Sequence, residues 1–429
     1  MIEEFSFGNF WSFKDIQTLN MTAAKIKSKN ALLDNVNLFS VDDHLSLIKA
    51  KAIYGANASG KSNVIKALVA FIRIIKDSVK EEKALNIISA FQLSTETSSE
   101  PTFFQLIFRI DKIRYRYGFE ADDESIKSEW LYSTPNKREQ LLFVREDKEI
   151  IEINQKHFEE GVLYKKLFKN SEDPIFTNSS LFLTHLASTG FGKISKLLIK
   201  SISSISIISG LGDRGMFSIA GESLNDSIKK KFILDFLQNA DIGIDNLETI
   251  EITNDDLSSE AIDEKVKENL KKSKIVVSSK TKYNAELKAE GESRFLFGIQ
   301  ESEGTKKMFE LSPFIYRSLK NGTPLIIDEF DSRFHPLLTK KIVELYNSFE
   351  NKTAQLIFTT HDTNLLSSDI LRRDQIDFIE KDRYGASHLY TLVELKGIRN
   401  DASFEKDYFQ GKYGAIPFLG NFTNLLSFE

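Results

Sequence analysis

The clearest chemical pattern in this sequence is the run Gly55-Ala-Asn-Ala-Ser-Gly-Lys-Ser62. Its spacing, Gly-x-x-x-x-Gly-Lys-Ser, is typical of a loop (the P-loop) whose backbone N–H groups surround phosphates. We expect Lys61 to reach the β- and γ-phosphates and the Ser62 hydroxyl to ligate Mg²⁺. The pattern therefore predicts binding of ATP with Mg²⁺. The predicted nucleotide-binding residues of this segment are Gly55, Asn57, Ser59, Gly60, Lys61, Ser62 and Asn63.

Two adjacent carboxylates follow the apolar run Leu325-Ile-Ile. Asp328 is expected to hold Mg²⁺, directly or through water, at the end of a buried strand. Glu329 is then placed to orient and deprotonate the water that attacks the γ-phosphate. Adjacent acids at a strand end are common, and it is their combination with a P-loop that predicts ATP hydrolysis.

A third polar group, Thr359-Thr-His-Asp362, follows the apolar run Gln355–Phe358. His361 is expected to point at the γ-phosphate from the neighbouring strand and to act in catalysis or in sensing hydrolysis. The alternative is a histidine that only caps the strand or satisfies a buried polar group. Its position after the Asp328 strand favours the catalytic interpretation.

The P-loop, the two carboxylates and His361 can act on one ATP only if the strands before them end at the same edge of a sheet. Alternating apolar residues predict short strands over residues 1–54, the last leading into the P-loop, and a mostly buried helix follows over residues 62–79. Further alternation over residues 101–150 predicts antiparallel strands. Four core strands are predicted in the last third of the chain, at Pro324–Glu329, Gln355–Thr360, Gln375–Glu380 and His388–Val393.

The middle of the chain has a different pattern, with helices broken by polar stretches. The run Ser201–Ser209 fits a strand or a helix, and the charged run Ile252–Lys274 predicts a solvated helical arm. We therefore predict an α/β fold in three parts. Residues 1–150 and 291–429 form the two halves of one nucleotide-binding head, and residues 151–290 form an inserted, mostly helical lobe.

The composition narrows the class of protein. The 429 residues are 41% hydrophobic and 28% charged, as in ordinary globular proteins. No run approaches the roughly 18 apolar residues of a membrane span, and the acidic start Met1–Phe7 does not resemble a secretory signal. The absence of cysteine fits a cytoplasmic protein. The net charge of −5 means that binding of DNA would need a local basic patch, such as Lys229–Lys231.

Together these motifs resemble the ABC-type ATPase heads of the SMC and DNA-repair class. Within that class the sequence is most similar to AAA-family ATPases of prokaryotic defence loci, the RloA and AbiL-type abortive-infection proteins. The segments that carry the resemblance are Phe7–Phe13, Glu301–Lys306, Asp328–Pro336, Arg372–Phe378 and Tyr408–Pro417.

The resemblance implies further site residues. Ser302 and the backbone at Gly304 correspond to the ABC signature, which would contact the γ-phosphate of ATP bound to another subunit. The alternative is that Ser302-Glu-Gly304 forms only a helix cap. His335, in the position of the D-loop, either bridges subunits or begins the next helix. Gln92 and Gln105 are both candidates for the Q-loop glutamine. Among Phe10, Trp11 and Phe13, one aromatic ring is a candidate to stack on adenine, with core packing as the alternative.

The resemblance also implies a function. The chain would be a homodimer or higher homo-oligomer that closes around shared ATP and controls a separately encoded effector, a nuclease or toxin, in anti-phage defence. A DNA-repair ATPase that clamps or scans DNA is the main alternative, and a scaffold that sequesters a toxin is another. The six histidines show no His-x-x-x-His spacing, so no second, metal-dependent nuclease centre is predicted.

Overall fold

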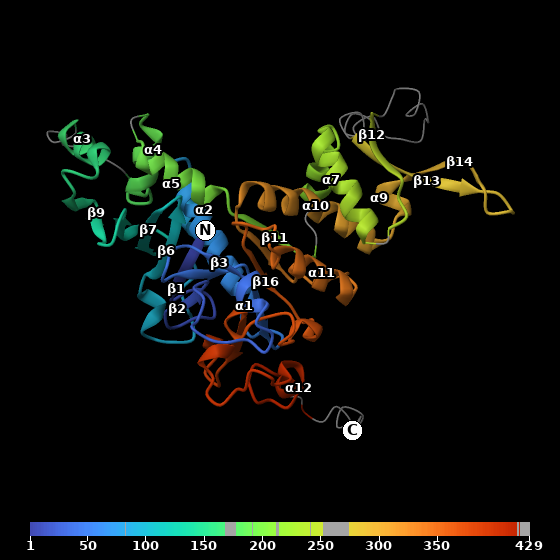
Figure 1. Cartoon of the computed structure of the whole chain (residues 1–429). Coiled ribbons are helices and arrows are strands. Elements are labelled where there is room, and N and C mark those ends of the chain that lie inside the picture. The colour runs from blue at the N-terminus through green and yellow to red at the C-terminus, as the bar shows by residue number, and fades with distance from the viewer. Residues whose placement is uncertain are drawn as a thin grey trace, which may run out of the picture.

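The computed structural model describes residues 1–81, 83–167, 177–190, 192–211, 214–240, 242–251, 274–417 and 420 (Figure 1). The helices are α1 (Leu33–Val36), α2 (Lys61–Asp77), α3 (Glu159–Leu167), α4 (Phe182–Ser188), α5 (Ile194–Ser203), α6 (Arg214–Ser223), α7 (Ser227–Asn239), α9 (Phe297–Gln300), α10 (Glu303–Asn321), α11 (Pro336–Tyr346) and α12 (Phe404–Phe409). The strands are β1 (Ile2–Gly8), β2 (Gln17–Asn20), β3 (Leu38–Ser40), β4 (Ser46–Ile48), β5 (Ala50–Gly55), β6 (Thr102–Ile110), β7 (Ile113–Ala121), β8 (Ile126–Thr134), β9 (Gln140–Glu146), β10 (Glu149–Ile153), β11 (Ser206–Ser209), β12 (Asn246–Glu251), β13 (Lys274–Tyr283), β14 (Ala289–Leu296), β15 (Leu325–Asp328), β16 (Leu356–Thr359), β17 (Ile376–Lys381) and β18 (Ser387–Thr391).

The central sheet has the strand order β11-β15-β16-β5-β17-β18. Its first five strands are parallel, and β18 runs antiparallel to β17. The ends of β5, β15 and β16 therefore meet at one edge, where parallel α/β sheets bind ligands. This arrangement confirms the predicted α/β fold class and the predicted strands of the last third of the chain.

Both faces of the central sheet are buried, as the apolar runs in its strands require. Ile53, Ile326 and Ile357 pack in one core with α2 and the large antiparallel sheet. Their neighbours along the strands, such as Tyr54 and Ile327, pack on the other side with α10 and α11. Helix α2 has apolar residues on more than one face and is largely buried, as predicted.

The large antiparallel sheet has the order β10-β9-β8-β7-β6-β1-β2 and confirms the antiparallel strands predicted over residues 101–150. A buried ion pair fixes α4 to this sheet. Glu129 accepts hydrogen bonds from the backbone N–H groups of Phe182 and Leu183 at 2.6 and 2.9 Å, and from Tyr117 Oη at 3.0 Å. Arg145 donates to the same carboxylate at 3.3 Å. Burial raises the pKa of Glu129, and the Arg145 charge acts against this effect.

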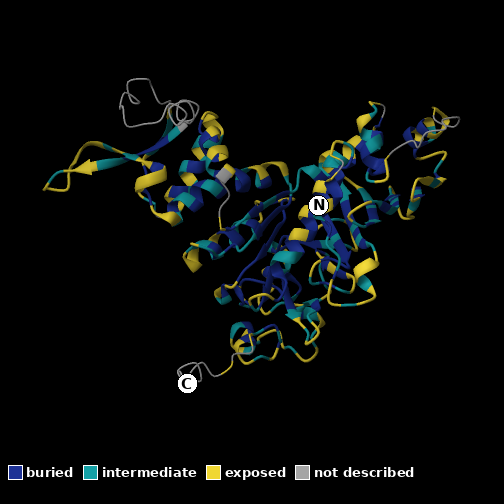
Figure 2. Cartoon of the chain, turned by 180° about the vertical axis from the view of Figure 1, so that it is seen from behind, coloured by how far each residue is buried: buried dark blue, intermediate teal, exposed yellow. Residues whose placement is uncertain are grey.

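The middle of the chain contributes strand β11 to the central sheet. It also forms helices α6 and α7 and a separate three-stranded sheet. The run Ser201–Ser209 divides between the end of α5 and strand β11, and β11 pairs with β15. Beyond it, α6 and α7 pack near the three-stranded sheet β12-β13-β14, whose last hairpin is largely exposed (Figure 2). Most of the predicted arm, Ile252–Lys274, lies outside the described residues. The three-part division of the chain stays a prediction.

Within the described residues, none of the helices combines the length and the apolar composition of a membrane-spanning segment.

Candidate functional site

The P-loop connects the end of β5 to the first residue of α2, as the motif requires. Two of its residues have left-handed backbone conformations, Ala58 with φ +61° and Gly60 with φ +117°. Glycine adopts this conformation without a side-chain clash. The Lys61 ammonium is buried against the loop and donates to the carbonyl oxygens of Gly55 and Ala56 at 2.8 and 3.0 Å. The lysine is thus held at the loop that is predicted to bind phosphate.

The inner wall of the P-loop is tightly packed around Gly55 and Ser59. A methyl group at Gly55 would lie 2.5 Å from both the Ser59 Oγ atom and the Ile379 carbonyl oxygen. Ser59 Oγ is buried and is one of a few side-chain atoms in the described residues with no hydrogen-bond partner. A buried hydroxyl without a partner is costly, and an added acceptor such as a phosphate oxygen would satisfy it.

The N-terminal segment anchors this loop through serine hydroxyls. Ser387 Oγ, in β18, donates to the Ser59 carbonyl oxygen at 2.6 Å and lies at hydrogen-bond distance, 2.9 Å, from Ser12 Oγ. The Asn63 amide also donates to Ser12 Oγ, at 2.8 Å. A methyl group at Gly60 would lie 2.6 Å from Ser387 Oγ, so glycine is required there for packing as well as for its φ angle.

The same segment decides between the three aromatic candidates. Phe10 and Phe13 are fully buried in the core, whereas Trp11 is 45% exposed. The Lys66 ammonium of α2 lies over the Trp11 ring, 4.1 Å from its centroid. Core packing therefore accounts for Phe10 and Phe13, and Trp11 is the aromatic residue that remains available to a ligand beside the P-loop.

Asp328 and Glu329 lie at the end of β15, and the neighbouring strand β16 holds them in place. Thr359 Oγ1 donates to Asp328 Oδ1 at 2.5 Å and accepts from the Glu329 backbone N–H at 2.7 Å. Glu329 has φ +52°, which is unusual for a residue with a side chain. Such conformations are strained and are often found at functional sites.

The charged side chains at the ends of β5, β15 and β16 lie at the same edge of the central sheet. The P-loop, Asp328 and His361 lie at the ends of these adjacent parallel strands. Burial lowers the pKa of Lys61, and the negative charges of Asp328, Glu329 and Asp331 act against this effect. Partial burial and the Lys61 charge lower the pKa of His361, against the effects of Asp331 and Glu329. The His361 backbone N–H donates to Asp331 Oδ1 at 3.1 Å. The predicted catalytic residues thus lie together with the P-loop.

The donors at this edge fit a magnesium ion bound with a nucleotide. Mg²⁺ is held in such sites by one or two carboxylates, a hydroxyl and substrate phosphates, and not by an all-protein cage. Asp328 and Ser62 are only partly buried and offer oxygen donors of this kind. In the part of the chain that the structure describes, no three His, Cys, Asp or Glu residues form a group that could hold a metal ion.

Ser302 and Gly304 lie at the start of α10. Ser302 caps α10, with its Oγ accepting from the Thr305 backbone N–H at 3.1 Å, so the helix-cap role considered for it is real. A methyl group at Gly304 would lie 3.3 Å from the carbonyl oxygen of Arg333. Among the hydrogen bonds of the described residues, none joins Ser302 or Gly304 to the P-loop of the same chain. The structure brings together the other predicted site residues and leaves these two apart.

Other candidates have structural roles. His335 caps α11, accepting from the Leu337 backbone N–H at 3.2 Å, so it begins the next helix. Gln105 lies in β6 and accepts from Trp130 Nε1 at 3.1 Å, within the large antiparallel sheet. Gln92 is exposed, and its amide donates to the Ala90 carbonyl oxygen at 3.1 Å.

One residue of the site is not apparent from the sequence. Gly210, directly after β11, donates from its backbone N–H to the Asp328 carbonyl oxygen at 2.5 Å. A methyl group at this position would lie 1.8 Å from the Glu329 carbonyl oxygen. The only sequence signal is a glycine after a short apolar run, which is too common to single out.

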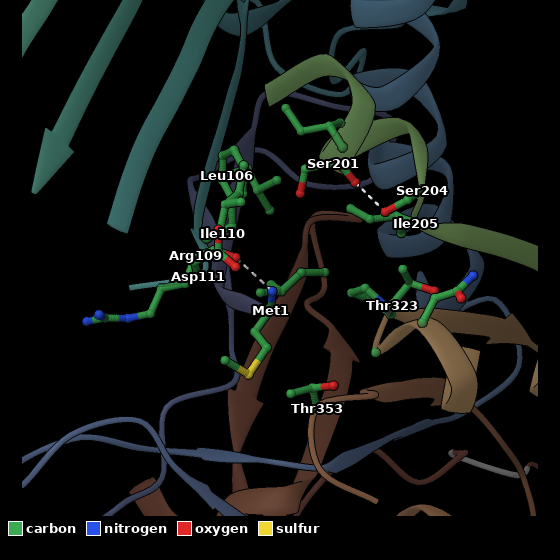
Figure 3. Close-up of a pocket in the computed structure, with 16 residues that line it drawn as sticks. Met1, Leu106, Arg109, Ile110, Asp111, Ser201, Ser204, Ile205, Thr323 and Thr353 are labelled. Carbon is green, nitrogen blue, oxygen red and sulfur yellow. Dashed lines mark hydrogen bonds between the residues drawn. The ribbon is translucent and has the colours of Figure 1, made fainter. Parts of the chain in front are cut away.

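A cavity of about 340 Å³ lies away from these residues (Figure 3). Met1, Arg109, Ser204 and Thr323 are among its lining residues, and it adjoins the chain that enters β15 at Pro324. It is therefore near the starting edge of the parallel strands, opposite the P-loop edge. None of the predicted site residues lines it.

The family described as "AAA domain, putative AbiEii toxin, Type IV TA system" matches residues 52–186 and 219–367. These ranges cover more than half of the chain, and the chain belongs to this family. The comparison with curated proteins gives no match.

Two solved structures are similar over most of the chain. The SMC head domain from Thermotoga maritima is 13% identical with a TM-score of 0.39, over 91% of this chain and 98% of that chain. The SmcHead bound to the C-winged helix domain of ScpA is 13% identical with a TM-score of 0.41, over 91% of this chain and 97% of that chain. The family assignment rests on the sequence match alone.

Proposed function

We propose that this AAA-domain protein binds and hydrolyses ATP and acts as a nucleotide-gated, ABC-type oligomeric switch. The observation that carries the proposal is that Lys61, the acids Asp328, Glu329 and Asp331, and His361 follow the adjacent parallel strands β5, β15 and β16 at one edge of the sheet. A buried lysine on a glycine-rich loop, facing acids at a strand end, is suited to phosphoryl transfer to water. The family match supports an ATPase domain.

The residues of the chain have separable roles in this reaction. The P-loop N–H groups and Lys61 bind the phosphates, and the buried Ser59 hydroxyl offers a further polar contact. Asp328 and Ser62 would hold Mg²⁺, which neutralises charge on the phosphates. Glu329 orients the attacking water and accepts its proton, in the position that Thr359 gives it. His361 contacts the γ-phosphate side from the end of β16.

We further propose that the site is completed by a second copy of the chain. Ser302 and the start of α10 are exposed and make no hydrogen bond with their own P-loop within the described residues. A helix N-terminus favours a phosphate group. Two copies arranged head to head would each place this surface on the ATP of the other, in a homodimer or within a higher homo-oligomer.

The biological output proposed is control of a separately encoded effector in anti-phage defence within the cytoplasm, as in RloA and AbiL-type proteins. The family description names a type IV toxin–antitoxin system, which supports a role together with a second, separately encoded protein. The alternative is an ATPase that clamps or scans DNA. In the candidate basic patch, Lys229 and Lys231 are paired with Asp226 and Asp235 at 3.6 and 3.2 Å, which weakens it.

Two substitutions test the ATPase. Lys61→Ala should abolish ATP binding, whereas Lys341→Ala, which removes an exposed lysine paired with Glu344, should leave it intact. Glu329→Gln should bind ATP but not hydrolyse it, and light scattering should show a stable oligomer only with ATP and Mg²⁺. ATP affinity that survives Lys61→Ala, or a monomer in Glu329→Gln with ATP, would refute the proposal. Stimulation of hydrolysis by DNA would favour the alternative.

Mixed oligomers test whether sites are shared. Ser302→Arg should block the surface offered to the partner, and Lys61→Ala should inactivate the P-loop of its own chain. A mixture of the two variants should regain about a quarter of the wild-type rate, because random pairing leaves one complete site in half of the dimers. No recovery would mean that each chain completes its own site. Affinity purification with the product of the adjacent gene tests the effector.

A further inference from the structure

The segment that follows β15 faces two parts of the molecule. Asp331 contacts the His361 backbone and is one of the charges that act on Lys61. Arg333, two residues later, contacts the start of α10, where its Nη1 donates to Glu303 Oε2 at 2.8 Å. Asp331 therefore belongs to the site of its own P-loop, and Arg333 belongs to the Ser302 surface.

The backbone of Arg333 has an unfavourable conformation. Its φ angle is +67°, in the left-handed region that residues with a side chain rarely adopt. Its carbonyl oxygen packs against Gly304, where a larger residue would make a close contact at 3.3 Å. The Arg333 side chain is 47% exposed. The strained loop thus presents an accessible arginine beside the helix start.

The pairing of Arg333 suggests a second position for it. The exposed Glu303 carboxylate is also bound by Lys306 at 3.0 Å, so it keeps a partner if Arg333 moves. Both cations lower the pKa of Glu303. A γ-phosphate at Ser302 would be repelled by Glu303 and attracted by Arg333, whose planar fork binds phosphate oxygens in pairs.

We propose that Arg333 is a catalytic residue supplied in trans. Its guanidinium leaves Glu303 and binds the γ-phosphate of the ATP held by Lys61 of a second copy. There it stabilises the charge that develops as the bond to the leaving diphosphate breaks and water forms the new P–O bond. The proposal rests on the proposed function, in which two chains share each ATP site. It adds the Arg333 guanidinium as the positive charge that the second chain supplies.

Steady-state kinetics of full-length variants test the role. Arg333→Ala should lower kcat by about 100-fold or more, with the KM for ATP changed less than about threefold, and Arg333→Lys should recover part of the loss. Glu303→Gln releases the guanidinium and should raise kcat. A kcat loss in Glu303→Gln equal to that of Arg333→Ala would show that the pair only supports α10. Wild-type kcat in Arg333→Ala would also overturn the proposal.

Mixed oligomers separate this proposal from the proposed function. Arg333→Ala mixed with Lys61→Ala should regain about a quarter of the wild-type rate, since one site per mixed dimer has both residues. Recovery with Ser302→Arg but not with Arg333→Ala would overturn the role of Arg333 and leave the shared site standing. Recovery with neither would overturn the shared site itself. In the Glu329→Gln background, Arg333→Ala should still form the ATP-dependent oligomer, which shows that the variant is folded.

Discussion

Thr359 and Asp328 are joined by a hydrogen bond of 2.5 Å between adjacent parallel strands. The same hydroxyl accepts from the Glu329 backbone N–H at 2.7 Å, so one side chain fixes both acids of the site. Because β16 lies between β5 and β15, Thr359 also lies between the P-loop strand and the acids. The position of the metal-binding and water-orienting groups thus depends on a residue that contacts neither ATP nor water in the proposed reaction.

Thr359→Val should impair hydrolysis more than binding. Valine keeps the shape but leaves the Asp328 carboxylate without a donor and the Glu329 N–H without an acceptor. Loss of such a supporting contact typically costs 10–100-fold in activity, and we expect kcat to fall in this range with a nearly unchanged KM. Thr359→Ser, which keeps the hydroxyl, should recover activity. Equal kcat values for the Val and Ser variants would contradict the prediction.

Gly210→Ala should damage the same site from the other side. The added methyl group would overlap the Glu329 carbonyl oxygen, so the chain after β15 must shift. We expect a loss of stability of about 1–3 kcal/mol, as for other overpacked positions, together with a loss of kcat. Gly243→Ala is the control, since a methyl group there meets no atom within 4 Å. Urea unfolding and ATPase assays measure both effects, and similar results for the two variants would refute the steric explanation.

Glu129→Gln should destabilise the large antiparallel sheet. The substitution removes the carboxylate charge that pairs with the fully buried Arg145, and breaking a buried ion pair typically costs about 3–5 kcal/mol. Asp235→Asn removes the exposed pair with Lys231 and should cost at most about 1 kcal/mol. The free energies of unfolding in urea compare the two. A loss below about 1 kcal/mol in Glu129→Gln would show that the pair has little net effect.

Trp11→Ala should weaken the binding of ATP because the adenine base loses the aromatic ring on which it stacks. Stacking of a base on an aromatic ring is worth about 1–3 kcal/mol, so the dissociation constant should rise about 10-fold. Trp11→Phe should retain most of the affinity. Tripolyphosphate, which has no base, should bind both variants as it binds the wild type. A loss that is equal for ATP and tripolyphosphate would place Trp11 in support of the P-loop and not beside the base.

Stability should rise with pH because of Lys307. This lysine is buried in α10 and donates to the Ser209 carbonyl oxygen at 2.9 Å, and burial lowers its pKa to about 8. Between pH 8 and pH 10 (roughly the unfolded value), the unfolded chain therefore holds more protons than the folded chain. The free energy of unfolding must increase with pH across this window.

Lys307→Met should remove this increase. We expect the variant to gain less stability than the wild type between pH 7.5 and pH 9.5, by up to about 2 kcal/mol. Urea unfolding at the two pH values measures the difference. Lys49, whose pKa burial also lowers to about 8, contributes equally to both proteins and cancels in the comparison. Parallel pH profiles would contradict the prediction.

Much of this site follows from local sequence patterns. The P-loop spacing predicts a strand, a turn and a helix within about 30 residues, and the apolar runs before Asp328 and Thr359 predict buried parallel strands because both of their faces are covered. The structure confirms these elements. The convergence of the acids with Lys61 follows from where parallel strands end.

The remaining features depend on contacts between distant segments. Gly210 matters only because β11 pairs with β15, and this pairing is not visible in a run that fits a helix or a strand equally well. Trp11 differs from Phe10 and Phe13 by its left-handed φ of +51°, which turns it out of an otherwise apolar segment. The periodicity of apolar residues does not reveal backbone conformations of this kind, so the sequence does not show which of the three rings is exposed.

The strand order of the central sheet has a consequence for synthesis of the protein on the ribosome. Both neighbours of β5, the strands β16 and β17, lie about 300 residues after it in the chain. While the intervening residues are made, at roughly 5–20 residues per second, β5 has no partner on either edge. Unpaired strand edges promote aggregation, so the nascent chain is a candidate for chaperone binding for tens of seconds. Until residue 381 has emerged, β5 lacks at least one of its two neighbours, so the P-loop follows a strand that is not yet fully paired.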